Sequence, residues 1–168
     1  MNKAILFTWL VFIFLLQVFV LNNINFFGYV NPYLYISFLF LFPLNKNRYP
    51  FLGCCFFYGL GIDFFSDTGG IHAFSLLFAG YFRLMFLRIF FKKTQIDYLL
   101  FSFQKESLGL VFNYVVTLTF IHHFILISLD NFNFQDMGSV FLNTFYSASF
   151  TLTLYFLGSY LFRKKQVG

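Results

Sequence analysis

The side chains best suited to chemistry in this chain lie inside long apolar segments, where a charged or imidazole group is costly and marks a candidate site. They are Asp63, Arg83, His72, His122 and His123. The two adjacent histidines point about 100° apart on a helix, so they cannot chelate one metal as a pair four residues apart would. The sequence also contains no Ser/His/Asp set, no glycosidase-like carboxylate pair and no phosphate-cradling loop. We therefore expect neither an enzyme nor a bound cofactor or metal.

Asp63 and Arg83 carry opposite charges, but we do not expect them to pair. Counting about 1.5 Å per residue from the turn between their helices, their depths differ by roughly 10 Å. Arg83 is expected to extend toward the cytoplasmic headgroups or to bond a carbonyl inside the bundle, with an anionic ligand as the alternative. Asp63 is expected to cap a turn or bond a neighbouring helix, with a ligand or partner contact as the alternative.

The turn after Asp63 suggests how its carboxylate is used. The next helix begins with free backbone N–H groups and the positive end of its dipole, and both favour an anion. Gly69 and Gly70 can adopt positive φ in the turn at little cost, and His72 follows as a second donor. We expect Asp63 to fasten the two helices together.

The elements that position these residues must be membrane helices. Of the 168 residues, 60% are hydrophobic and only 10% are charged, whereas soluble domains carry about 25% charged residues. The sequence predicts one all-α membrane domain, residues 1–168, with about six transmembrane helices. The expected spans are about 4–21, 26–44, 50–65, 71–91, 108–129 and 137–162.

Two of these spans need comment. The first has 18 apolar-rich residues, from Ala4 to Leu21, and no small-residue cleavage site follows, so we expect a transmembrane helix rather than a signal peptide. The second contains Asn31 and Pro32, and the missing proline N–H predicts a kink or a late helix start.

The basic residues predict the orientation. The loops 22–31, 66–70 and 130–136 contain no Lys or Arg, so the basic residues of the loops and tails all lie on the other side. That side is expected to be cytoplasmic, with both termini there. The net charge of +5 is thereby explained as a topology signal and not as nucleic-acid binding.

Composition raises two further expectations. The 32 Phe and 11 Tyr residues favour lipid-facing side chains over an aromatic surface for ring compounds. Small residues, among them Gly53, Gly59, Gly61 and Gly80, should let helix backbones approach closely. Cys54 and Cys55 are expected to behave as small hydrophobic residues.

Residues 95–107 form a separate pattern between two spans. Apolar residues recur there at helical spacing, with charged residues at both ends; they are Ile96, Leu99, Leu100 and Phe103. This predicts a short helix in the cytoplasmic interface. It is either a simple connector or a docking surface for a partner.

One stretch, from Gly59 to Phe74 (GLGIDFFSDTGGIHAF), resembles the signature of the MreD family of rod-shape-determining membrane proteins. In that signature a Gly-Leu-x-x-Asp helix end is followed by a short turn and a Gly-x-His-Ala helix start. Asn31 with Pro32, Pro43, the chain length, the span count and the short loops also resemble the family. The Phe content and Asp67 depart from it.

The resemblance implies a non-catalytic component of the complex that makes lateral-wall peptidoglycan, in the bacterial cytoplasmic membrane. Its partners would be membrane lipids, an MreC-like protein, a RodA-like glycosyltransferase, a penicillin-binding transpeptidase and an MreB-like filament. Together with Arg83 and with Leu99 and Phe103 of the predicted interfacial helix, four residues of the resembling stretch are our candidate structural or partner-contact residues: Gly59, Asp63, Gly70 and His72.

The resemblance also implies the fold of the substrate-binding subunits of energy-coupling-factor transporters. A small-molecule-binding subunit of that kind is the alternative function. Such subunits typically carry an Ala-x-x-x-Ala-like face on the first helix, and here Ala4 is followed by Thr8, Trp9 and bulky aliphatic residues.

Overall fold

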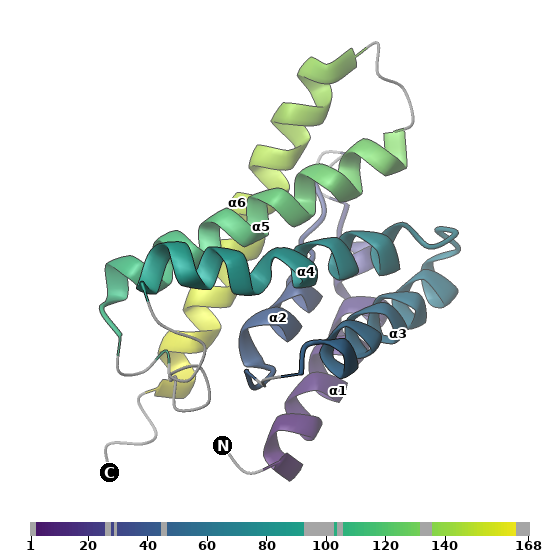
Figure 1. Cartoon of the computed structure of the whole chain (residues 1–168). Helices are drawn as coiled ribbons and strands as arrows, with labels where there is room; N and C mark the ends of the chain where they lie inside the picture. The colour runs from purple at the N-terminus through teal and green to yellow at the C-terminus, as the bar shows by residue number, and fades with distance from the viewer. Residues whose placement is uncertain are drawn as a thin grey trace.

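The computed structural model describes residues 3–25, 28, 30–44, 47–92, 103, 106–131 and 136–163. These residues form helices and connecting segments and contain no β-strand. The elements are α1 (Lys3–Phe19), η1 (Leu21–Asn23), η2 (Leu34–Ile36), α2 (Ser37–Leu41), α3 (Tyr49–Ser66), α4 (Ile71–Phe91), α5 (Leu108–Asn131) and α6 (Met137–Arg163) (Figure 1). The predicted all-α class is confirmed.

Among the described residues, four helical segments are long and apolar enough to cross a membrane: Ala4–Asn23, Ile71–Phe91, Leu108–Asn131 and Met137–Leu161. Their surroundings fit a bilayer, because the arrangement of polar and apolar groups is inverted relative to a water-soluble protein. Large apolar side chains such as Phe7 and Phe64 are exposed, the latter by 82%, whereas Asp63, Arg83 and His122 are buried. The chain is a helical, multi-pass membrane protein.

The expected second span is not a continuous helix. Helical structure begins only at Leu34, after Pro32, and ends at Leu41, where extended Phe42 precedes Pro43. The predicted late start is confirmed, and the described helical part of this span is short because a proline stands near each of its ends. Tyr35, Ile36 and Leu39 are fully buried, and α2 lies in the middle of the molecule (Figure 1).

Helices α3 and α4 pack closely through small residues, as predicted. A Cβ atom on Gly59 would lie 2.5 Å from the Cα of Ala73, and one on Gly80 would lie 2.9 Å from the Cys55 sulfur. A Cβ atom on Gly61 would meet the ring of Phe14 on α1, also at 2.9 Å. Gly53, by contrast, faces open space, so its predicted packing role is wrong.

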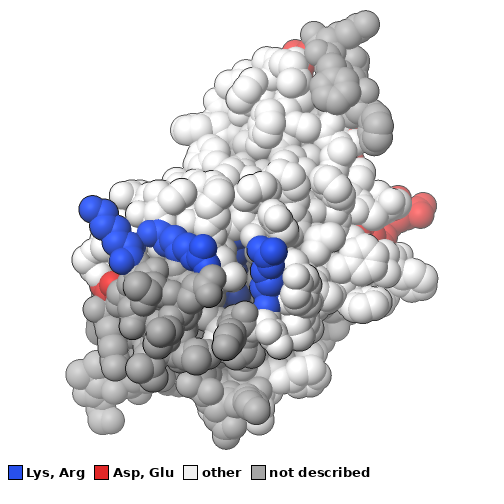
Figure 2. All heavy atoms as spheres, viewed as in Figure 1, with Lys and Arg blue, Asp and Glu red and all other residues white. Residues whose placement is uncertain are grey.

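Charged groups are segregated along the bundle. In Figure 2, Lys and Arg form a band across the left and middle of the visible face, while most Asp and Glu atoms lie at the right edge and the top. In the sequence, Arg48 precedes α3 and Lys92 follows α4, whereas Asp67 and Asp136 stand at the opposite helix ends. The described residues therefore define a basic end and an acidic end.

Most of the predicted interfacial helix, including Leu99, lies outside the described residues. Phe103 is described, and its ring centroid lies 6.1 Å from that of Phe91 and 5.6 Å from that of Tyr114. This residue therefore packs against α4 and α5 near the basic end.

We predict that Gly59→Ala destabilises the bundle strongly while Gly53→Ala does not. The new Cβ at position 59 meets backbone atoms of α4 that cannot rotate away, and overpacking of this kind costs about 1–3 kcal/mol. At position 53 alanine has free space and a higher helix propensity, worth up to about 1 kcal/mol. Thermal unfolding in detergent measures both, and equal melting temperatures for the two variants would contradict the packing argument.

Candidate functional site

A first group of buried polar residues lies toward the acidic end, where the end of α3 meets the start of α4. Asp63 is buried, and its Oδ1 accepts hydrogen bonds from the Thr68 hydroxyl (2.6 Å) and from the backbone N–H of His72 (2.9 Å). Its Oδ2 accepts the backbone N–H of Ala73 at 2.7 Å. The predicted hydrogen bonds from the start of the fourth helix are confirmed. We call Asp63, Thr68, His72 and Ala73 the α3–α4 corner.

The backbone of the turn makes these bonds possible. Asp67, Gly69 and Gly70 all have positive φ, at 54°, 65° and 102°. This left-handed path reverses the chain within four residues, so that the first N–H groups of α4 face the end of α3. The predicted positive φ of the two glycines is confirmed, and Asp67 shares the conformation.

His72 serves the corner through its backbone and not through its imidazole. The ring instead turns into the bundle, where Nδ1 lies 2.9 Å from the hydroxyl of Tyr35. The expected donation from His72 to Asp63 is confirmed, and it comes from the backbone N–H at the helix start.

Tyr35 joins three helices through its hydroxyl group. The oxygen lies between Nδ1 of His72 and Nε2 of His122, the latter at 2.8 Å. Nδ1 of His122 lies 3.4 Å from Nδ1 of His123, which in turn lies 2.9 Å from the carbonyl oxygen of Thr119. These side chains are buried, so they depend on one another for hydrogen bonds.

The donor and acceptor roles of these rings depend on their tautomers, and one arrangement fits the Thr119 carbonyl, which only accepts. In this arrangement Nδ1 of His123 carries the proton facing Thr119, and the facing Nδ1 of His122 carries none. His122 then donates through Nε2–H to the oxygen of Tyr35, whose hydroxyl proton is free to face Nδ1 of His72.

The irregular backbone before α2 is held by side chains from the two outer helices α1 and α6. Helical hydrogen bonds are missing here, and polar side chains replace them. The bonds are Asn31 N–H to Ser147 Oγ (3.3 Å), Tyr33 N–H to Thr151 Oγ1 (2.9 Å), Tyr35 N–H to Gln17 Oε1 (3.2 Å) and Gln17 Nε2 to the Pro32 carbonyl (3.0 Å). Nε2 of His123 also lies 2.9 Å from the hydroxyl of Thr151.

We call these residues the buried polar network: Gln17, Tyr35, His72, His122, His123, Ser147 and Thr151. Of its members, sequence analysis proposed only His72 as a contact residue. Two signals could have identified more of it. Gln17 is the amide that interrupts the first apolar stretch, and the three histidines fall in one half of the membrane. Tyr35 gave no signal, because a tyrosine is ordinary in an aromatic-rich chain.

Arg83 lies apart from the network, toward the basic end. It is only 2% exposed, its Nη2 donates to the carbonyl of Phe42, and its guanidinium carbon lies 4.6 Å from the ring centroid of Phe51. The expected bond to a carbonyl inside the bundle is confirmed. Because Asp63 and Arg83 have separate partners, the absence of a direct pair between them is also as expected.

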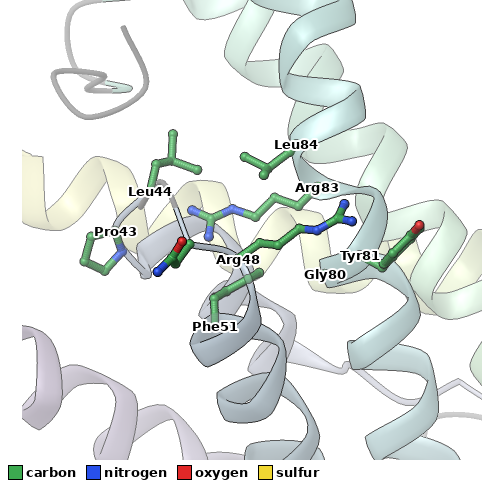
Figure 3. Close-up of a pocket in the computed structure, with 9 residues that line it drawn as sticks. Pro43, Leu44, Arg48, Phe51, Gly80, Tyr81, Arg83 and Leu84 are labelled. Carbon is green, nitrogen blue, oxygen red and sulfur yellow. The ribbon is translucent and has the colours of Figure 1, made fainter. Parts of the chain in front are cut away.

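The Arg83 guanidinium lines a small pocket between the α2–α3 connection and α4 (Figure 3). Arg48 enters from the other wall, and its guanidinium carbon lies 5.1 Å from the ring centroid of Tyr81. Asn47 and Leu44 complete the rim. We call this the arginine pocket. Within the described part of the chain, no group of three or more His, Cys, Asp or Glu residues could hold a metal ion.

We predict that Asp63→Ala lowers the free energy of unfolding more than Asp63→Asn does. Alanine leaves two buried N–H groups unpaired, each at a cost of about 1–3 kcal/mol. Asparagine keeps an oxygen for Thr68 and His72 and loses only the acceptor for Ala73. Thr68→Val, which removes one half-buried hydroxyl, should cost about 1 kcal/mol. Unfolding in detergent ranks the three variants, and a larger loss for Asn than for Ala would refute the assignment.

We also predict that Tyr35→Phe destabilises the fold by about 2–4 kcal/mol, because both flanking imidazoles lose their hydroxyl partner inside the bundle. Tyr146→Phe removes a hydroxyl from an exposed ring and should change the melting temperature little. Comparable melting temperatures for the two variants would show that Tyr35 does not join the helices.

Comparison of the chain with protein-family models, curated proteins and solved structures finds no match.

Proposed function

We propose that this chain is a non-catalytic membrane component of the bacterial cell-wall elongation complex, of the MreD type, which supports cell shape by holding partner proteins. The observation that carries the proposal is the α3–α4 corner. The residues that resemble the MreD signature meet there: Gly59 admits the backbone of α4 at Ala73, and Asp63 accepts the N–H groups of His72 and Ala73.

The bonding of these residues favours a structural role over catalysis. Both oxygens of Asp63 are occupied by donors from the same chain, and the imidazoles of His72, His122 and His123 are buried and bonded to neighbours. A general acid or base must instead reach a substrate. These internal hydrogen bonds hold the helices in place, as a protein that presents a fixed surface to its partners requires.

The proposed topology has six crossings, with both termini in the cytoplasm of the inner membrane. The η2–α2 segment forms a broken second crossing, and α3 the third. With 18 residues, α3 is about 27 Å long, close to the thickness of the hydrocarbon layer. The segregation of charge supports this orientation, because the basic end is expected on the cytoplasmic side (Figure 2). The proposed fold is that of the energy-coupling-factor substrate-binding subunits.

The alternative function, a small-molecule-binding transporter subunit, is disfavoured by the surface of α1. Its exposed positions carry bulky side chains, including Ile5, Phe7 and Phe12. A coupling subunit that docks on small residues would find only Ala4 and Thr8, followed by bulky side chains.

Reporter fusions test the topology. Fusions after Asn47, Lys93 and Lys165 should report the cytoplasm, whereas fusions at Asn23, Gly69 and Asn133 should report the exterior. The reason is that loops rich in Lys and Arg stay on the cytoplasmic side of the membrane. An exterior signal at Lys93 would rule out the six-crossing arrangement.

Depletion and rescue test the function. Loss of the protein in its own host should turn rod-shaped cells round, and the tagged chain should co-purify with an MreC-like protein after cross-linking. Wild type and Gly53→Ala should restore rods, and Gly59→Ala should not. Normal cell shape after depletion, or recovery of a transporter ATPase in place of the MreC-like protein, would overturn the proposal.

A further inference from the structure

The arginine pocket holds a cation whose hydrogen bonding is incomplete. A guanidinium has five N–H donors, yet among the described residues Arg83 bonds only the Phe42 carbonyl, and its buried Nε has no acceptor. The hydroxyl of Tyr114 lies nearby but makes no hydrogen bond of standard geometry. Buried donors normally find a partner, so this site is short of an acceptor.

The charge of the pocket is also uncompensated. Arg48 is exposed and rests on the rings of Tyr81 and Tyr49, at 5.1 and 5.8 Å from their centroids. Neither it nor Arg83 has a carboxylate partner among the described residues. Figure 3 shows the two side chains crossing the pocket in opposite directions, Arg83 toward Leu44 and Arg48 toward Tyr81. Two cations at one pocket call for an anion with several oxygens.

The size of the pocket limits how that anion enters. The pocket is open on one side and has a volume of about 10 Å³, enough for one oxygen-sized group. A phosphate could place one oxygen inside, next to Arg83, and keep the others at the mouth, next to Arg48 and Asn47. A phosphate group suits this arrangement, because guanidinium groups bind its oxygens in pairs.

The position of the pocket indicates where the phosphate comes from. Arg83 lies over Phe51, less than one helical turn from the start of α3 at Tyr49, so the pocket lies near the level at which α3 enters the membrane. Beside it, α4 exposes a stripe of large apolar side chains at helical spacing: Phe74, Phe78, Tyr81, Met85 and Ile89. From the pocket, an acyl chain can lie along the part of this stripe that runs away from the basic end, over Phe78 and Phe74.

We propose that the arginine pocket binds the phosphate of an anionic phospholipid, with Arg83 and Arg48 as its ligands. Arg83 supplies the buried donor, and the exposed Arg48, which rests on Tyr81 in this structure, supplies the second positive charge at the mouth of the pocket. Tyr81 stands where the headgroup site meets the acyl stripe. The site does not depend on the proposed role in cell-wall elongation.

Native mass spectrometry of the delipidated protein in detergent tests the site, with phosphatidylglycerol, phosphatidylcholine and inorganic phosphate as separate probes. We expect phosphatidylglycerol to bind wild type, and Arg48→Gln to weaken this binding about tenfold, because a charge-assisted contact is lost. Lys92→Gln removes one positive charge from the same end outside the pocket, and should bind as wild type does. We substitute the exposed Arg48 and not Arg83, because Arg83 also donates to the Phe42 carbonyl and its loss would disturb the fold.

Each result decides the proposal. Equal loss in Arg48→Gln and Lys92→Gln would reduce the effect to general surface charge and overturn the site. Unchanged binding in Arg48→Gln would overturn it as well. If inorganic phosphate competes fully and phosphatidylcholine binds no better than phosphate, a free anion and not a lipid is the ligand, and the lipid assignment fails.

Discussion

The structure depends on one constraint, the need to satisfy the non-helical backbone between Asn31 and Tyr35 inside a membrane protein. Water cannot supply these hydrogen bonds in hydrocarbon, so irregular backbone survives there only when protein groups surround it. Gln17 on α1 and the hydroxyls of Ser147 and Thr151 on α6 supply them. Both helices are thereby held around the short η2–α2 unit, which would otherwise be too short to cross a bilayer alone.

The buried polar network extends this arrangement to α4 and α5. Tyr35 follows the irregular segment directly, and its hydroxyl connects an imidazole on each of these helices. Because each buried polar side chain needs a partner, the network favours the helix arrangement that brings these partners together. Apolar packing in lipid is less selective, since lipid tails resemble apolar side chains. The exposed Phe and Leu residues therefore provide solubility in the bilayer, and the polar residues provide specificity.

How much the sequence could predict depended on distance along the chain. The hydrogen bonds of Asp63 could be predicted, because its partners lie 5 to 10 residues away across a turn whose glycines are visible in the sequence. The late helix start after Pro32 was predictable for the same local reason. The roles of Tyr35 and Thr151 were not, since they join residues 87 and 118 positions apart. The sequence predicted that Arg83 bonds a carbonyl group, but it did not predict that this carbonyl belongs to Phe42, because that depends on where α2 ends.

The same long separations constrain the order in which the protein can be made. The segment around Tyr33 leaves the ribosome long before Thr151 and Ser147, on which its backbone depends. Until α6 arrives, exposure of that segment to lipid would leave its N–H groups unpaired. The nascent segment must therefore wait in the water-accessible interface or against the insertion machinery. The segment before α2 is then completed last, although it is made early, and a chain whose synthesis stops before α6 lacks the hydroxyl groups that bond its backbone.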